Sequence, residues 1–557
     1  MFPRNHITGL RTSWVISFVY GPSSKFAILF LVLAVSLGAG GVFAQSIRSA
    51  SIEEEVEGEL EILHEDRDVG SRYLYFLKAA NRRFSLNFAK DPPTHLTSGA
   101  RVRVRGVRTN GVLALQSGGD SVQVLSSALP NTLGEQRTLV ILVNFRNNNS
   151  QPYTVDFANN VFFSTTSNFF LENSYQQTHL SGVVKGWYTI DMASPINAPT
   201  CDYSLISSLA DQAASSAGVV LSDYSRKVYA FPQSGCGWWG LSSVGGTPSR
   251  SWINGSLELG VTAHELGHGL GLWHSHSLDC GATAVVGPSC ATNEYGDIVD
   301  MMGASHSAHY NAFQKERLGW LNSGASPSIT TVGTDGTYGL EVYESVGSGP
   351  KALKVLKSID PSTGNRSWYY IESRQAIGFD GFLANEPSQN VLNGVLVHTG
   401  TEGNGNSGYL LDMTPATPVY YWWYDPALMV GQTFQDPDTG MTMTTDWVSG
   451  TGASVTVSFG AGGLAAVTVV TDQTSYTRNQ SVSIKATVRS GSAPVANAAV
   501  NFIVKKSNGA LVTGTATTGS NGTAVYKLRL TRKDPVGNYE ADAAAMSASA
   551  ATNFMVQ

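Results

Sequence analysis

The run HELGHGLGLWH, which begins at His264, constrains this chain more than any other feature of its sequence. On a helix each residue turns by about 100°, so His264 and His268 lie on one face, where two imidazoles can hold one metal ion. Glu265 is offset by one residue, which places its carboxylate beside the metal. Gly271 tolerates the positive φ at which the helix can stop, so that His274 can turn back as a third ligand. The run therefore predicts a helix that ends sharply around a metal site.

Three neutral imidazoles leave a fourth position open for water, as a catalytic zinc site requires. Zinc lowers the pKa of its water from about 15.7 to about 7 and polarises a scissile carbonyl. Glu265 can then act as the general base and return the proton to the leaving amine. A bare HExxH is common by chance, whereas the complete HExxHxxGxxH spacing is specific. We therefore predict a Zn²⁺ endopeptidase with His264, His268 and His274 as metal ligands.

The motif resembles that of the metzincin metallopeptidases, whose members place a methionine beneath the metal in a downstream turn. The segment YGDIVDMMG, followed by LGWL, is most similar to the gametolysin-like (autolysin) peptidases. By this resemblance Met302, just before Gly303, is the Met-turn residue. Met301 is the alternative, and a plain core methionine is the simpler interpretation of either. The resemblance covers roughly residues 138–460 and implies zinc, endopeptidase activity and protein substrates of the cell wall or extracellular matrix.

The chain departs from the metzincin pattern after the predicted Met-turn. Some metzincins place a tyrosine two residues past the methionine, where it acts as an extra ligand or oxyanion partner. Ala304 stands there in this chain. His309 or Tyr310 could fill the role, although an ordinary polar position is the simpler interpretation of each.

Four acidic residues lie close to the motif in sequence and could bind Ca²⁺, which takes six to eight oxygen ligands. They are Asp279, Glu294, Asp297 and Asp300. Their spacing matches no known calcium loop, so aspartates that hydrogen-bond within the fold are the alternative.

The N-terminus carries the pattern of a signal peptide over residues 1–44. Basic residues precede the apolar run FAILFLVLAVSLGAGG, and Val42 and Ala44 occupy the −3 and −1 positions of a small-residue cleavage site. We expect a secreted protein that has no membrane contact after cleavage. An uncleaved membrane anchor is the alternative, because the basic segment is long.

Alternation of apolar and polar residues predicts five short strands between residues 52 and 125. Five strands suit an OB-like module, and the region 45–130 is placed where secreted proteases usually carry a propeptide. A permanent β-module is the alternative. No cysteine precedes Cys201, so a propeptide of this chain cannot inhibit through a cysteine on the zinc.

The chain is predicted to be multidomain, with an α/β (α+β) metzincin-like catalytic domain over 131–325. TLVILVNF reads as a strand buried on both faces, 155–174 and 202–218 have helical spacing, and RKVYAF is another strand. Residues 326–460 return to strand patterns and form a β-rich accessory domain.

The C-terminal residues 464–557 alternate in SVSIKATV, AAVNFIVKK, TAVYKLRLT and NYEADAAA, which predicts a β-sandwich. This region resembles bacterial Ig-like domains, and we expect it to act as a spacer or to contact a surface or polymer.

The four cysteines suit an oxidising compartment and allow three pairings. On local spacing we favour Cys201–Cys236 and Cys280–Cys290. Four free buried thiols are the alternative.

Composition and motifs limit the other function classes. Charged residues make up only 14% of the chain and no basic patch is visible, which excludes nucleic-acid binding. No G-x-S-x-G elbow supports a serine hydrolase. The alternative to a peptidase is a secreted adhesion or binding protein with a degenerate or non-catalytic metal site, in which Glu265 would be dispensable.

Overall fold

The computed structural model describes residues 53–557 apart from 68–69, 81, 90–91, 93, 116–120, 286–289, 305–306, 323–326, 361–362, 386–389, 418–424, 460–464, 491–492 and 546–547. The expected signal peptide, 1–44, and the first residues of the expected propeptide lie outside this range. Within the described part of the chain, no helix combines the length and apolar character that a membrane span requires.

The described residues between 53 and 126 form six strands, one more than the alternation predicts. They are β1 (Glu53–Asp66), β2 (Ser71–Ala79), β3 (Arg82–Phe88), β4 (Arg101–Thr109), β5 (Val112–Leu115) and β6 (Val122–Ser126). Pairing runs from β1 through β2, β3, β5 and β4 back to β1, so five strands close into a ring, as a small barrel requires. Inward-facing residues such as Ile62, Leu77 and Val102 are fully buried in its core.

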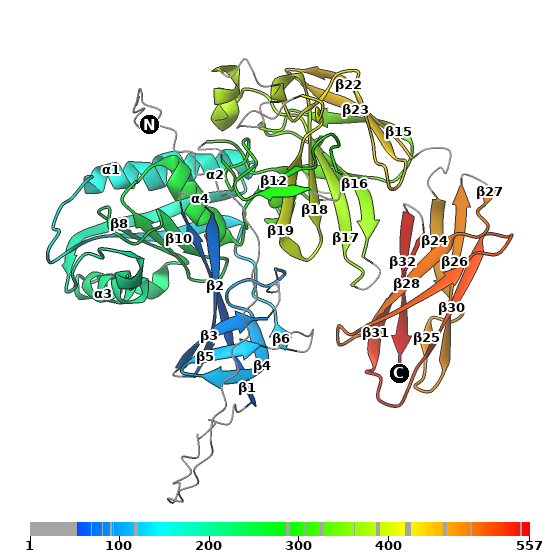
Figure 1. The fold of residues 1–557 in the computed structure, drawn as a ribbon, viewed down its shortest axis with the longest axis horizontal. Helices are drawn as coiled ribbons and strands as arrows, with labels where there is room; N and C mark the ends of the chain where they lie inside the picture. Colours follow the sequence, from blue (N-terminus) through cyan, green and yellow to red (C-terminus); the bar gives the residue numbers. More distant parts are fainter. Residues whose placement is uncertain are drawn as a thin grey trace, which may run out of the picture. The chain divides into compact units, whose positions relative to one another are not determined.

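The next region contains a mostly parallel sheet. Its strands are β7 (Gly134–Phe145), β8 (Thr178–Ile190), β9 (Arg226–Phe231), β10 (Gly240–Ser243) and β11 (Ser249–Asn254). β10 pairs with β11 on one side and with the end of β1 on the other, both antiparallel. The barrel strands and this sheet therefore form one continuous eleven-stranded sheet (Figure 1). β1 is long enough to belong to both parts.

Helices cover both faces of this sheet (Figure 1). They are α1 (Val155–Asn160), the π-helical turn Val161–Thr166, α2 (Ser167–Asn173), α3 (Tyr203–Ser216) and α4 (Leu259–Leu270). The short helix α5 (Ala312–Arg317) packs instead against β17 (Arg366–Glu372) and β18 (Gly394–Thr401) of another sheet. Single 3₁₀ segments are Ala198–Thr200, Leu221–Asp223, Gly378–Asn385 and Val391–Asn393. Val140 and Leu142 of β7 face the core shared with α2 and α4, whereas Leu139 and Ile141 face the core under α3. The prediction that TLVILVNF is buried on both faces is confirmed.

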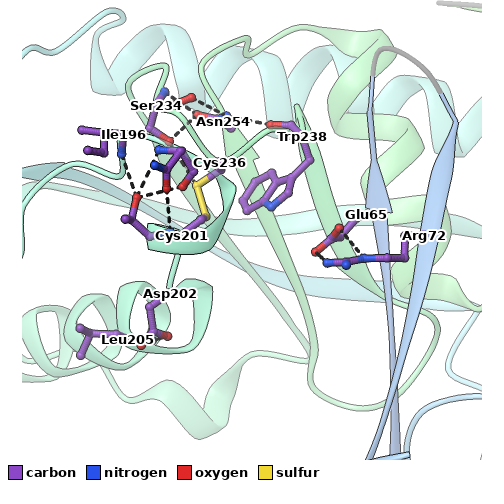
Figure 2. Close-up of a disulfide and its surroundings, with 12 residues drawn as sticks. Glu65, Arg72, Ile196, Cys201, Asp202, Leu205, Ser234, Cys236, Trp238 and Asn254 are labelled. Carbon is purple, nitrogen blue, oxygen red and sulfur yellow. Dashed lines mark hydrogen bonds and ion pairs between the residues drawn. A yellow bond between two sulfur atoms is a disulfide. The ribbon is translucent and has the colours of Figure 1, made fainter. Parts of the chain in front are cut away.

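Both predicted disulfides are present, and no cysteine is free. The bond between Cys201 and Cys236 joins the loop after β9 to the start of α3, where the Asp202 side chain accepts a hydrogen bond from Leu205 N (Figure 2). The second bond, Cys280–Cys290, closes a short loop between β12 and β13. The alternative of four free thiols is wrong.

Two further sheets follow. The first contains β12 (His276–Asp279), β13 (Ala291–Asn293), β14 (Ser328–Val332), β16 (Pro350–Ile359), β17 (Arg366–Glu372), β18 (Gly394–Thr401), β19 (Asn404–Leu411) and β20 (Leu428–Met429). The second contains β15 (Gly336–Glu341), β21 (Thr433–Gln435), β22 (Thr442–Ser449) and β23 (Gly452–Ser458). They share one apolar core. Because β12 precedes residue 325 and pairs with both β13 and β19, the predicted catalytic and accessory domains share a sheet.

The C-terminal residues form two sheets around one core. One contains β24 (Ala465–Thr471), β26 (Ser481–Ser490), β27 (Ala493–Pro494) and β30 (Thr523–Arg529). The other contains β25 (Ser475–Tyr476), β28 (Ala499–Lys505), β29 (Leu511–Thr517), β31 (Gly537–Ala545) and β32 (Ala548–Val556). All four strands predicted from alternation in this region are confirmed.

Candidate metal centre

The helix α4 carries the motif and ends where the sequence predicts. Gly271 has φ +107 and caps the helix, with its N–H donating to the His268 carbonyl at 2.8 Å. Leu272 N donates back to the Gly267 carbonyl at 3.0 Å, so the last turn is closed. After this break the chain runs directly to His274. The helix ends at Gly271 for the reason that the sequence predicts, because only glycine adopts such a φ without strain.

The three motif histidines converge on one point. His264 Nε2 lies 3.2 Å from His274 Nε2. The His268 ring centroid lies 4.9 Å from that of His264 and 5.2 Å from that of His274. All three side chains are buried.

Each of the three rings is fixed through its other nitrogen. His264 Nδ1 donates to the Met301 carbonyl at 2.8 Å, and His268 Nδ1 donates to the Leu272 carbonyl at 2.9 Å. His274 Nδ1 donates to Glu294 Oε1 at 2.8 Å. Such bonds fix the tautomer, because they leave the Nε2 lone pair of each ring free for a metal ion.

The arrangement fits a tetrahedral metal ion. With metal–nitrogen bonds of about 2.0–2.1 Å, two ligands of a tetrahedral site are about 3.3 Å apart. The separation of 3.2 Å between His264 Nε2 and His274 Nε2 agrees with this value. Two buried carboxylate atoms that face the site, Asp66 Oδ2 and Glu265 Oε1, have no hydrogen-bond partner. A buried carboxylate keeps its charge only where it is paired or coordinates a metal ion, so the two atoms are suited to a site that holds a cation.

Two residues of β1, His64 and Asp66, also face the motif histidines. Asp66 Oδ1 lies 2.8 Å from His274 Nε2 and 3.5 Å from His264 Nε2, and Asp66 Oδ2 lies 3.3 Å from His268 Nε2. His64 Nδ1 lies 2.9 Å from His268 Nε2. His64, Asp66, His268 and His274 form the one group of potential metal ligands found among the described residues. The sequence predictions did not include His64 or Asp66.

Glu265 lies beside the site, fully buried. Its Oε2 accepts a hydrogen bond from Ser242 Oγ of β10, whereas Oε1 has no partner. Burial and then the negative charge of Asp66 raise the pKa of Glu265 well above its ordinary value. The carboxylate is thus held by one oxygen and left free at the other.

Met302 packs under α4. A β-carbon on Gly267 would lie 2.6 Å from Met302 Sδ, so the helix can approach the methionine only because residue 267 is glycine. Met301 points its carbonyl at His264 instead. The turn is held by Asp300, which accepts hydrogen bonds from Met302 N at 2.6 Å and from Asn311 N. Burial, together with the charge of a neighbouring aspartate, raises the pKa of Asp300 to about 7.

A tyrosine that the sequence predictions missed stands at the site. The Tyr295 hydroxyl donates to Asp66 Oδ1 at 3.0 Å, and its ring centroid lies 4.3 Å from that of His274. His309 and Tyr310, the residues considered for this role from the sequence, make other contacts. His309 Nε2 lies 2.8 Å from Glu172 Oε1, and the Tyr310 hydroxyl donates to the Ala263 carbonyl at 2.9 Å.

Comparison with known families gives a match at this part of the chain. The model of the gametolysin peptidase M11 family matches residues 137–399. Residues 137–399 are therefore similar to the gametolysin peptidases, and we name them the gametolysin-like region. The match includes α4, the Met302 turn and strands up to β18, so it runs past the domain boundary predicted at 325.

Outside the gametolysin-like match, the comparisons add little. None of the curated proteins matches the chain. An alkylpurine DNA glycosylase of Pseudomonas fluorescens is 13% identical over 17% of this chain and 30% of its own, with a TM-score of 0.14. A cycloisomaltooligosaccharide glucanotransferase of Paenibacillus sp. is 23% identical over 17% of this chain and 14% of its own, with a TM-score of 0.14.

The adhesin InvE of Yersinia pseudotuberculosis is 17% identical over 30% of this chain and 55% of its own, with a TM-score of 0.14. The chain therefore spans less than two thirds of each of these three proteins. At TM-scores of 0.14, none of these structures indicates a fold for any part of the chain.

Three of the acidic residues considered for calcium make hydrogen bonds or ion pairs with groups of the protein. Glu294 Oε1 accepts from His274 Nδ1 and from Ser71 Oγ, at 2.8 and 2.6 Å. Asp297 Oδ2 lies 2.9 Å from His398 Nε2. Asp279 Oδ1 accepts from Gly281 N at 2.9 Å. Calcium binding stays a prediction, with no converged set of these ligands among the described residues.

Proposed function

We propose that this chain is a secreted zinc-dependent endopeptidase that hydrolyses peptide bonds of extracellular or cell-wall proteins. One observation carries the proposal. Three histidine Nε2 atoms converge on a point beside a buried glutamate whose Oε1 has no partner. The gametolysin peptidase match over residues 137–399 supports the same activity.

The zinc ligands would be His264, His268 and His274. When bound, zinc would lower the pKa of water and polarise the scissile carbonyl. Bonds from the three Nδ1 atoms to Met301 O, Leu272 O and Glu294 hold the rings in the orientation that zinc needs. Met302 supports the site from below, where its side chain packs against α4 at Gly267.

Glu265 would transfer the proton from the attacking water to the leaving amine. Ser242 Oγ holds Oε2, so the carboxylate does not rotate freely, and Oε1 can accept a proton from the attacking water. The same oxygen then delivers that proton to the leaving amine.

Tyr295 is positioned to donate a hydrogen bond to the substrate. Its hydroxyl donates to a carboxylate oxygen of Asp66, which resembles the negatively charged oxygen that develops during amide hydrolysis. We assign it the role that Ala304 cannot fill.

Secretion rests on the signal-peptide pattern over residues 1–44, and zymogen status on the position of the region 45–130. We assign the C-terminal sandwich, expected to be Ig-like, a contact with a surface or polymer. A secreted adhesion or binding protein is the second candidate. Its support is that the described residues before β7 and after α5 consist mainly of strands.

Two measurements test the proposal. Protein purified from the culture medium should contain one zinc ion per chain, and casein digestion by its processed form should stop with a chelator and return with added zinc. Glu265→Gln should keep the zinc and lose turnover by about 10²–10⁴-fold. Digestion that resists the chelator but stops with a serine-directed inhibitor would contradict the proposal. Stoichiometric zinc with no digestion by any processed form would favour the binding protein.

A further inference from the structure

We propose that Asp66 is a fourth metal ligand, supplied by the N-terminal barrel, which closes the site and keeps the peptidase inactive. The inference rests on the proposed zinc function and specifies how that site is regulated. The segment His64–Asp66 at the end of β1 is called the latch below. Asp66 precedes His274 by 208 residues in the sequence and reaches the site only through the fold.

Asp66 has the position of a ligand toward all three histidines. Its carboxylate oxygens lie 2.8, 3.3 and 3.5 Å from the Nε2 atoms of His274, His268 and His264. These distances bracket the value of about 3.3 Å expected between ligands of a tetrahedral zinc ion. A catalytic zinc site needs one position open for water, and Asp66 takes that position.

The rest of the latch shuts the site off from solvent. His64 lies fully buried against the Tyr73 ring, parallel to it with centroids 4.0 Å apart, and also 4.0 Å from the His274 ring. The Tyr295 hydroxyl donates to Asp66 Oδ1. His64 Nδ1 lies 2.9 Å from His268 Nε2, and a ligand atom of His64 lies within 4.8 Å of one of His274. The Asp66 carboxylate lies within 3.5 Å of the Nε2 atoms of all three motif histidines. We therefore assign the ligand role to Asp66 and a covering role to His64.

Backbone pairing fixes the latch. β1 runs antiparallel to β10 with Leu63 opposite Ser243 and Asp66 opposite Gly240. Because side chains alternate along a strand, His64 and Asp66 face the site together. Glu65 between them faces the other way and pairs with Arg72 of β2 at 2.9 Å (Figure 2).

The same pairing blocks the edge of β10. An extended peptide can add to a free sheet edge through main-chain hydrogen bonds, and β1 takes this edge beside Glu265 and Ser242. The barrel is also anchored by Trp273, which packs into the barrel core next to the third histidine. The closed state is therefore stabilised by the pairing of β1 with β10, by Trp273 in the barrel core and by the Asp66 carboxylate at the histidines.

Release requires that β1 leave β10. The connection between β6 and β7, residues 127–133, contains an accessible position for cleavage, since Leu129 is 89% exposed. No thiol takes part, because all four cysteines are paired.

The test uses the full-length chain with Co²⁺ in place of zinc, and acetohydroxamate as a small probe of an open coordination position. At probe concentrations that shift the Co²⁺ absorption bands of Asp66→Ala and Asp66→Asn, the bands of the wild type should not respond. If the latch is open about 1% of the time, removing it lowers the apparent Kd of the probe about 100-fold. Glu65→Gln is the matched control and should behave as the wild type, because its side chain faces away from the site.

The outcomes separate the two proposals. If the wild type binds no Co²⁺, the proposed function itself is contradicted. A wild-type chain that binds Co²⁺ and responds to the probe at once would overturn the latch, whether or not the variants fold. A response in His64→Ala but not in Asp66→Ala would also overturn it, since His64 would then be the closing residue. Thermal melting of each variant checks that the barrel remains folded.

Discussion

Gly240 and Glu265 lie so close that a β-carbon on residue 240 would fall 1.5 Å from Glu265 Oε1. Residue 240 opens β10 and Glu265 lies on α4, so strand and helix meet at the atom that we expect to carry the proton. The free volume at Gly240 is thus part of the catalytic geometry.

Gly240→Ala should therefore displace the Glu265 carboxylate and leave the zinc ligands in place. We expect kcat/KM on a peptide substrate to fall by about 10²–10⁴-fold, the contribution of a positioned general base, with zinc content unchanged. Gly339→Ala is the control, because a β-carbon there meets nothing within 4 Å. Equal activity of the two variants would disprove the role of the close approach.

Gly267→Ala should loosen the methionine turn. Its β-carbon would lie 2.6 Å from Met302 Sδ and 2.8 Å from the Tyr310 hydroxyl oxygen. Overpacking of a filled core costs about 1–3 kcal/mol, so we expect a lower melting temperature and weaker zinc retention. The control is Gly381→Ala, at a position with open space around the β-carbon. An unchanged melting temperature for Gly267→Ala would show that Met302 does not support α4.

The sequence could predict those parts of the site in which the interacting residues lie close together along the chain. The positions of His264, His268 and Gly271 follow from helix geometry within eleven residues, and that prediction is confirmed in α4. Both disulfides also followed from short spacing.

Asp66 and Tyr295 could not be predicted in the same way. Asp66 reaches His274 across 208 residues, and its orientation depends on the register of β1 with β10. Tyr295 precedes the methionine turn, whereas the family pattern directs attention to the residues after it. Alternation alone predicted strands near residue 60 but gave no partner for them, because strand pairing is a property of the whole fold.

Glu294→Gln should weaken zinc binding without touching a ligand. The Glu294 carboxylate accepts the Nδ1 proton of His274 at 2.8 Å, and the loss of such a bond typically costs about 10–100-fold in metal affinity. Competition with a chromophoric chelator measures the effect. Glu341→Gln removes a carboxylate that pairs with the buried Lys351, far from the site in the accessory region, and should leave zinc affinity unchanged. Equal affinity of both variants would contradict the positioning role of Glu294.

Tyr295→Phe tests the proposed donor to the substrate oxygen. Removal of one such donor costs about 10²–10³-fold in kcat, and KM should change little because the bond forms mainly as charge develops. The processed enzyme is the proper sample, since Tyr295 bonds Asp66 while the latch is closed. A change in KM alone would assign Tyr295 to substrate binding instead.

Lys315 gives the gametolysin-like region a distinctive dependence of stability on pH. The ammonium is fully buried, 4.0 Å from the Tyr343 ring centroid and 3.0 Å from His309 Nδ1. Burial, with the nearby charge of Arg374, lowers the pKa of Lys315 to about 7. Three carboxylates act in the opposite direction, namely Asp380, Glu372 and Glu344.

The sign of the effect follows from proton uptake. Between pH 7 and the ordinary lysine value of 10.5, the native state has lost the Lys315 proton while the unfolded state keeps it. Unfolding therefore takes up a proton, and the free energy of unfolding that Lys315 contributes rises with pH across this window. Lys315→Met should lack this contribution, so the difference in melting temperature between wild type and variant should change steadily in favour of the wild type from pH 7 to pH 10. A difference independent of pH would mean that Lys315 keeps its charge in the folded protein, held by the three carboxylates and the tyrosine rings.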